Sequence, residues 1–414
     1  MAPRKKLKLS KAVVATLCGV GILLSGAALV VSTYPARWEI VHAEVPAPEP
    51  EVVEQKPRIA YVPTPEPLYG IYMSQCVSGT PSFRDSLVEF IDTTPLNAVV
   101  IDIKDFTGKI SFPTDNPILA DSVSDECGAR DMKEFVARLH EKNIYVIGRI
   151  TVFQDPYYTK KHPEAAVQSA GIRPGQPWQD HKGLSFIDVS HKPYWDYVVE
   201  LSRVAHEDIG FDELNYDYIR YPSDGPMSDA RFVNPNKPEA VEKFWKYLHE
   251  KVDPMGVVMS ADLFGYVTVL HDDLGIGQQL ERAMPYFDYI MPMVYPSHYN
   301  KGFAGLKNPN DDPYTVIHRS MVEAVRRTVA TSTPVQTLSG TYIASSSPAR
   351  YTKAAYSALQ QRPWLQDFDY GKDYTAADID AQIRGTYDAG LTSWIFWDAG
   401  NKYSALREYF ATSP

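Results

Sequence analysis

From residue 68 onward, short apolar segments alternate with longer segments in which apolar residues recur every three or four positions. In residues 131–143, Met132, Phe135, Val136 and Leu139 have the i, i+3, i+4, i+7 spacing of an amphipathic helix. The short segments are rich in Val, Ile and Tyr, which is typical of strands buried on both faces of a parallel sheet. The segments predicted as strands are 69–75, 97–105, 144–153, 213–222, 257–265, 289–296, 362–368 and 393–400.

This alternation predicts an α/β fold over residues 68–414, namely a (β/α)8 TIM barrel with insertions. A doubly wound open sheet is the alternative architecture. It would be favoured by a glycine-rich phosphate-binding loop after the first strand, and the sequence has no such loop there. The seventh strand has a second candidate at 334–338, which would make 339–361 an insertion after it.

The N-terminal part of the chain has a different pattern. Residues 1–11 are strongly basic, and residues 12–32 are uncharged and mostly apolar, long enough to cross the hydrocarbon core of about 30 Å as a helix. The basic residues in front predict a single-pass signal anchor in the cell membrane, with a cytoplasmic N-terminus and an extracytoplasmic barrel. A cleaved signal peptide is the alternative, although its apolar core is usually only about 7–15 residues long. Residues 33–67 are rich in Pro and Glu, which predicts a flexible linker.

Charge and cysteine usage narrow the possible partners. The formal net charge is −10 and the sequence has no basic stripe outside its first residues, which argues against nucleic acid as a partner. A neutral or weakly charged polymer remains compatible with this charge. An oxidising compartment would allow a disulfide between Cys76 and Cys127, although their spacing does not establish one. No Cys and His cluster has the spacing of metal ligands, so we expect neither a metal nor a cofactor.

Polar residues gather where the predicted strands end, which is where TIM barrels form their active sites. Asn215 and Asp217 share one side of the fourth strand, and Asp262 ends the neighbouring fifth strand. Two carboxylates across a barrel mouth are what glycoside hydrolysis needs, because one must be protonated and the other ionised. We therefore predict Asp217 and Asp262 as the catalytic pair.

Other polar and aromatic residues at strand ends are candidates for substrate binding. Aromatic rings would stack on the apolar face of a sugar, and the candidates are Phe264, Tyr295, Trp364 and Trp397. For each of them taken alone, core packing is the commoner role. A single Asp at a strand end is often a helix cap or a turn residue, which is the interpretation we favour for Asp105 and Asp367. The predicted substrate-binding residues are Asp102, Lys104, Arg149, Asn215, Arg220, Phe264, Tyr295, Gln366, Trp397 and Asp398.

The strand segments also carry a family resemblance. Its most specific part is FDELNYDYIRYP (211–222), and the other parts are YGIYMSQ (69–75), AVVIDIKDFTGKI (98–110), YVIGRITVFQDP (145–156), SADLFGY (260–266), DYIMPMVYPSHY (288–299), RPWLQDF (362–368) and SWIFWDAGNKY (393–403). In this order they resemble a family of bacterial glycoside hydrolases with a TIM-barrel domain, within the superfamily of α-amylase-like enzymes. The resemblance spans about residues 69–410, and it favours 362–368 as the seventh strand and 331–361 as an insertion.

The resemblance implies a carbohydrate-active barrel in which Asp217 matches the strand-four aspartate. Enzymes of the α-amylase type pair that aspartate, as nucleophile, with a strand-five glutamate, and this sequence has Asp262 instead. Glu213 lies too early in the fourth strand to replace that glutamate.

Two functions of different classes follow. The first is a glycoside hydrolase that acts on a cell-envelope or extracellular polysaccharide. The second is a non-catalytic carbohydrate-binding or cell-wall scaffold protein on a degenerate barrel, which would be favoured by a distance between the two Asp carboxyls well above about 9.5 Å. A polysaccharide esterase or deacetylase is a weaker third reading, because the sequence shows neither a serine–histidine pair nor a metal triad at the mouth.

Overall fold

The computed structural model describes residues 59–343 and 347–412. The predicted membrane anchor at 12–32 lies outside the described residues, as does most of the predicted linker. Among the described residues, no helix has the length and apolar character that crossing a bilayer requires.

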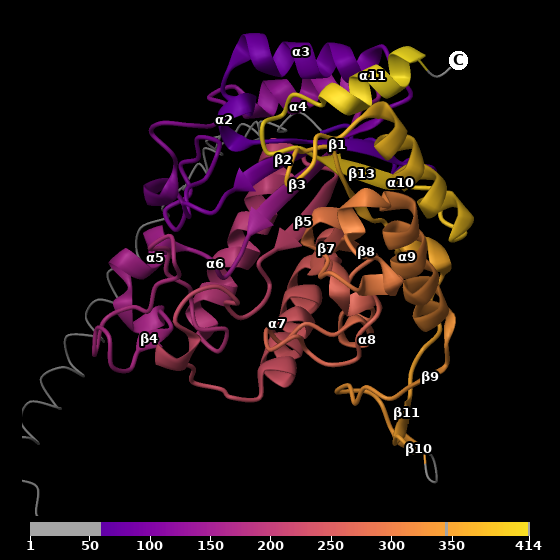
Figure 1. The fold of residues 1–414 in the computed structure, drawn as a ribbon. Coiled ribbons are helices and arrows are strands. Elements are labelled where there is room, and N and C mark those ends of the chain that lie inside the picture. Colours follow the sequence, from indigo (N-terminus) through magenta and orange to yellow (C-terminus); the bar gives the residue numbers. More distant parts are fainter. Residues whose placement is uncertain (1–58, 344–346, 413–414) are drawn as a thin grey trace, which may run out of the picture. The chain divides into compact units, whose positions relative to one another are not determined.

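Eight parallel strands close into a barrel, in the spatial order β1-β13-β12-β8-β7-β5-β3-β2 (Figure 1). Each of the predicted strands overlaps one of them, so the predicted TIM-barrel architecture is confirmed. The strands are β1 (Tyr69–Met73), β2 (Ala98–Lys104), β3 (Tyr145–Thr151), β5 (Glu213–Asp217), β7 (Val258–Phe264), β8 (Tyr289–Met293), β12 (Trp364–Gln366) and β13 (Trp394–Trp397).

Amphipathic helices cover the outside of the barrel. The longer ones are α3 (Pro81–Asp92), α4 (Met132–Glu141), α6 (Lys192–Arg203), α7 (Lys237–Val252), α9 (Pro313–Val329), α10 (Ala376–Asp388) and α11 (Ser404–Thr412). Shorter helices are α2 (Gln75–Ser78), α5 (Pro156–Lys161) and α8 (Leu280–Ala283). Local sequence sets several helix starts. The side chain of Asp312 caps α9, and Thr375 with Asp378 forms a capping box on α10.

Strand alternation divides the core into two layers. Ile395 points into the barrel with Tyr72 and Val100, while Phe396 packs in the large cluster between strands and helices. Trp397 packs partly buried against the inner cluster. The residues at the carboxyl ends of the strands are thereby presented at one mouth of the barrel.

The opposite end of the barrel is closed by residues that precede β1. The Val62 amide donates to Asp212 Oδ1 at 2.8 Å, and Thr64 Oγ1 lies 3.0 Å from the Tyr145 hydroxyl. Arg362 there pairs with Glu213 at 2.9 Å, and both side chains are fully buried. The end of the predicted linker therefore contacts the barrel at the amino ends of its strands.

Insertions enlarge the basic barrel. Between α9 and β12, β9 (Ser332–Thr333), β10 (Tyr342–Ile343) and β11 (Arg350–Thr352) form a small antiparallel sheet that projects from the barrel (Figure 1). This confirms 331–361 as an insertion, and the alternative seventh strand at 334–338 is wrong. A second small sheet pairs β4 (Gln168–Ser169) with β6 (Ala230–Arg231).

A disulfide joins Cys76 in α2 to Cys127 in the loop after β2. The sequence had left this bond open. It connects two segments beside the barrel mouth, so it stabilises one wall of the region described next.

Candidate active site

Arg149 of β3 lies at the centre of the barrel mouth among three carboxylates. Its Nη1 donates to Asp102 Oδ1 at 2.6 Å, its Nη2 donates to Asp217 Oδ2, and its Nε lies 3.6 Å from Asp262 Oδ2. The strand register explains this cluster, because Asp102 and Arg149 are paired between β2 and β3, and Arg149 is paired with Asn215 of β5. The negative potential of the three carboxylates raises the pKa of Arg149 above its usual value against the opposing effect of burial, so this group stays charged.

Asp262 of β7 is almost completely buried and is held by neutral donors. Asn215 Nδ2 donates to its Oδ1 at 2.9 Å, and Trp364 Nε1 donates to the same oxygen at 2.7 Å. Burial, followed by the nearby negative charge of Asp217, raises the pKa of Asp262 to about 8, although Arg149, Asn215 and Trp364 act in the opposite direction. At neutral pH this carboxyl group is therefore mainly protonated.

Asp217 ends β5 in a different environment. Its Oδ2 accepts from Arg149 and its Oδ1 accepts from the Tyr218 amide at 2.5 Å, so both oxygens face positive or donor groups. Tyr218 has a φ of 51°, a left-handed conformation that is unfavourable for a tyrosine. This turn ends the strand at Asp217, five residues earlier than the predicted end at 222, and it aims the carboxylate into the mouth.

The separation of these two carboxylates suits the chemistry of glycosidases. One guanidinium group contacts both, and its rigid fork limits the distance between the nearer oxygens to roughly 8 Å. Retaining enzymes use about 5–5.5 Å and inverting enzymes about 6.5–9.5 Å between their carboxyl groups. The two carboxyl groups therefore lie no farther apart than the upper end of this range.

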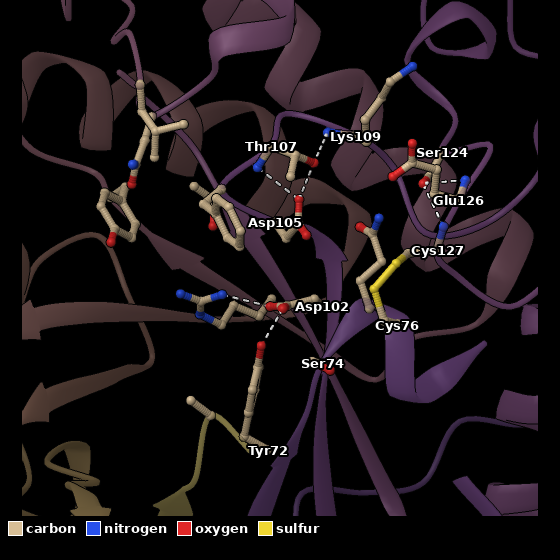
Figure 2. Close-up of a pocket in the computed structure, with 18 of the residues that line it drawn as sticks. Tyr72, Ser74, Cys76, Asp102, Asp105, Thr107, Lys109, Ser124, Glu126 and Cys127 are labelled. Carbon is tan, nitrogen blue, oxygen red and sulfur yellow. Dashed lines mark hydrogen bonds and ion pairs between the residues drawn. A yellow bond between two sulfur atoms is a disulfide. The ribbon is translucent and has the colours of Figure 1, made fainter. Parts of the chain in front are cut away.

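Asp102 forms the third side of the cluster. The Tyr72 hydroxyl donates to its Oδ2 at 2.5 Å, and burial raises the pKa of Asp102 although Arg149 favours its ionised form. Figure 2 shows Tyr72 pointing at Asp102 from the neighbouring strand. Asp102 therefore helps to orient the guanidinium group of Arg149.

Two adjoining cavities open at this mouth. One cavity has a volume of about 470 Å³ and contains Asp217 and Asp262, and we call it the catalytic cavity after the predicted role of this pair. The other, the side cavity, has a volume of about 700 Å³ and contains Asp102. Arg149, Tyr218 and Trp397 line both of them. The two cavities therefore share a common wall, and the disulfide lies on the far side of the side cavity (Figure 2).

Aromatic residues line the catalytic cavity, as a sugar site requires. Tyr295 and Trp397 are stacked with ring centroids 5.6 Å apart, and the guanidinium group of Arg220 lies 4.6 Å from the ring centroid of Phe264. Burial lowers the pKa of Arg220. The structure thus brings together most of the predicted side chains, namely Asp102, Arg149, Asp217, Arg220, Asp262, Phe264, Tyr295, Trp364 and Trp397.

Three predicted binding residues have structural contacts instead and are absent from the walls of both cavities. Lys104 is fully buried, with its Nζ 2.9 Å from Asp155 Oδ2, so it cannot reach a ligand. Gln366 Oε1 accepts from the Ser297 hydroxyl at 2.9 Å. Asp398 follows β13 and accepts from the amides of a turn, including that of Lys402 at 2.6 Å. Their assignment to the substrate is not supported.

Asn215 also contacts no cavity, but it acts on the site through Asp262. Glu213, at the other end of β5, pairs with Arg362 and lies away from the mouth, as expected from its early position. The sequence analysis missed Tyr72, Tyr218 and His298 as wall residues. Tyr72 lies in the predicted strand 69–75, and its side chain points into the barrel. Strand alternation could therefore have identified it. No such signal existed for the backbone turn at Tyr218.

The chain is thus a TIM barrel that has two carboxyl groups and aromatic walls at the carboxyl end of its strands. The sequence profile of the family described as "Putative glycosyl hydrolase domain" matches residues 70–403, and the chain belongs to this family. The predicted resemblance is therefore confirmed.

Solved structures share the fold at low sequence identity. The glycoside hydrolase domain of PgaB (BpsB) from Bordetella bronchiseptica is 12% identical, with a TM-score of 0.53 over 84% of this chain and 99% of that one. Alpha-L-fucosidase isoenzyme 2 from Paenibacillus thiaminolyticus is 11% identical, with a TM-score of 0.54 over 83% of this chain and 49% of that one. No curated protein sequence matched.

Proposed function

We propose that this protein is a glycoside hydrolase that acts on a cell-envelope or extracellular polysaccharide. The observation that carries the proposal is the pair formed by Asp217 and Asp262, two carboxyl groups that line one cavity in contact with the same guanidinium group. Family membership supports the reaction class.

The geometry supports different roles for the two groups. Asp262 would donate its proton to the departing glycosidic oxygen as the bond to the anomeric carbon breaks. Asp217, held by Arg149 and a backbone amide, would either attack the anomeric carbon or take a proton from the attacking water. Water supplies the hydroxyl group of one product, and in the retaining case Asp262 recovers its proton from that water.

The non-catalytic scaffold is less well supported. Such a protein would keep aromatic walls but would not need two carboxyl groups within the reach of one guanidinium group. The disulfide between Cys76 and Cys127 is consistent with an oxidising compartment and so supports extracytoplasmic action. The apolar segment 12–32 supports attachment to the membrane.

Hydrolysis assays on a panel of polysaccharides test the proposal. The wild-type full chain should release reducing ends from at least one polymer, and Asp217→Asn should reduce that rate by at least about 1,000-fold while leaving the circular dichroism spectrum unchanged. Asp253→Asn is the control, because it makes the same chemical change at an exposed aspartate that precedes β7, at the amino ends of the barrel strands. Unchanged turnover by Asp217→Asn would refute the assignment.

A further inference from the structure

Three buried polar side chains that line the side cavity each have an oxygen atom without a hydrogen-bond partner. Gln75, Thr151 and Gln154 are only 2%, 1% and 4% exposed. Within the protein, Gln75 Oε1, Thr151 Oγ1 and Gln154 Oε1 accept no hydrogen bond. Buried polar groups are nearly always paired, so three unpaired groups in one wall indicate a place where a ligand supplies the partners.

The backbone around these side chains is firmly held. The carbonyl of Gln75 accepts from the Gly128 amide at 3.1 Å, and the neighbouring Cys76 is fixed by its disulfide to Cys127. The carbonyl of Thr151 accepts from the buried Lys104 Nζ at 2.7 Å. A preorganised set of polar groups binds a ligand at a smaller entropic cost than a mobile one.

The side cavity continues from the catalytic cavity. Arg149, Tyr218 and Trp397 line both cavities, so the two cavities adjoin at the same mouth. A chain of sugar units that extends from Asp217 and Asp262 would enter the side cavity across these three residues. The volume of about 700 Å³ lies within the range of small-molecule pockets. It therefore has room for a further part of an extended substrate.

The chemistry of the unpaired groups identifies that part. Carboxamides and hydroxyls both donate and accept hydrogen bonds, as sugar hydroxyls do, and none of the three carries a charge. The charged residues of the cavity are already balanced in part, since Asp102 pairs with Arg149 and Lys109 Nζ donates to the Val123 carbonyl at 3.3 Å. The remaining wall includes the ammonium group of Lys182 and the carboxylates of Asp105, Asp125 and Glu126, so its negative groups outnumber its positive one and disfavour an anionic sugar.

We propose that the side cavity is a second glycan subsite, in which Gln75, Thr151 and Gln154 bind a neutral, polyhydroxylated sugar unit linked to the unit in the catalytic cavity. This inference rests on the proposed function, because the catalytic cavity is taken to hold the bond that is cleaved. It implies that the substrate is an oligosaccharide or polysaccharide with neutral units and that a monosaccharide glycoside fills only half of the site.

Titration calorimetry with the Asp217→Asn full chain tests the subsite apart from turnover. The probes are cellotetraose, xylotetraose, maltotetraose, laminaritetraose and chitotetraose as neutral glycans, with tetragalacturonate as the anionic one. We expect at least one neutral tetrasaccharide to bind at least about 10-fold more tightly than tetragalacturonate. Adding Gln154→Met or Thr151→Val should weaken that binding about 10-fold each, the effect of one lost hydrogen-bonding group.

Gln361→Met is the matched control. Gln361 is also buried with an unpaired Oε1, but it precedes β12, at the amino end of the barrel strands. Its substitution should leave the dissociation constant unchanged. Two variants in the side cavity are used so that a folding defect in one does not decide the result.

The subsite is overturned if no neutral tetrasaccharide binds or if binding survives both side-cavity substitutions. Tighter binding of tetragalacturonate would also overturn it. The proposed function fails separately, if the wild-type chain binds the same tetrasaccharide through Gln154 and Thr151 but does not hydrolyse it. Hydrolysis with no effect of either substitution on binding would leave the function standing and refute the subsite.

Discussion

Trp364 Nε1 donates a hydrogen bond to Asp262 Oδ1 at 2.7 Å, so a side chain of β12 orients a carboxyl group of β7. Asn215 of β5 donates to the same oxygen. With both donors on Oδ1, the other oxygen of Asp262 is the one that faces Arg149, at 3.6 Å from its Nε. The position of the acidic proton is thereby set by residues that need not touch the substrate.

The alkaline limb of the pH–activity profile should report Asp262. Burial and the nearby Asp217 raise its pKa to about 8, and a general acid must be protonated to act. The acid form predominates below that pKa, so the rate should fall as the pH rises through about 8. Hydrolysis rates measured from pH 5 to pH 10 check this, and an alkaline limb retained in Asp262→Asn would assign it to another group.

Trp364→Phe should move that limb to higher pH. The indole donates to Asp262, and this bond favours the ionised form and lowers the pKa of the carboxyl group. Loss of one hydrogen bond to a charged group is worth about 1.5–3 kcal/mol, which corresponds to an upward shift of roughly one pH unit or more. The same pH series measures it. Trp397→Phe alters a wall of both cavities without touching Asp262, so an equal shift there would contradict the explanation.

Arg149→Gln should destabilise the fold most strongly at high pH. The substitution leaves the buried Asp102 and Asp217 without their shared cation, and breaking such a pair costs about 3–5 kcal/mol. Protonation of a carboxylate relieves the repulsion between Asp102 and Asp217. Because burial raises the pKa of Asp102, its protonation begins at a higher pH than for an ordinary aspartate. Urea denaturation at pH 5 and pH 8 should therefore show the larger loss at pH 8.

The control for that experiment is Arg384→Gln, which breaks an exposed pair with Asp380 on α10. Exposed pairs contribute about 0–1 kcal/mol, so its free energy of unfolding should change little at either pH. A loss of similar size in both variants would show that the three carboxylates do not depend on Arg149.

Reduction of the disulfide should weaken the fold by up to about 4 kcal/mol, because the bond between Cys76 and Cys127 closes a loop over a sequence separation of 51. Urea denaturation with and without dithiothreitol measures this loss. The double variant Cys76→Ser/Cys127→Ser should be as unstable as the reduced protein and insensitive to dithiothreitol. An effect of dithiothreitol on that variant would show that the reductant acts elsewhere.

The barrel was accessible to sequence analysis because its strands are short, apolar and separated by clear helical periods. The regular alternation of strands and helices also located Asp217 and Asp262. Because the barrel strands are parallel, residues at the carboxyl ends of all of them lie at the same mouth of the barrel. The cluster around Arg149 needs the register between strands as well, and a single sequence does not contain that register.

Lys104 and Asp398 lie outside both cavities for local physical reasons. Asp102 and Lys104 are two residues apart on β2, so strand alternation places both side chains on the same face. The register between β2 and β3 shifts between these two residues, however, and Lys104 pairs with Asp155 instead of pointing into the mouth. Asp398 lies beyond the last residue of β13, where the turn through Gly400 and Lys402 uses its oxygens. Alternation does not predict either the irregular register or the turn.

Residues 59–67 reach the barrel at the amino ends of its strands, through contacts such as that of Val62 with Asp212. The carboxylates open at the other end. An attachment ahead of residue 59, such as a solid support, a dye or a fused protein, would therefore join the barrel at the amino ends of its strands. The mouth at the carboxyl ends would stay open to a long polymer. Immobilisation through the amino end should accordingly preserve access for substrates that are themselves too large to diffuse.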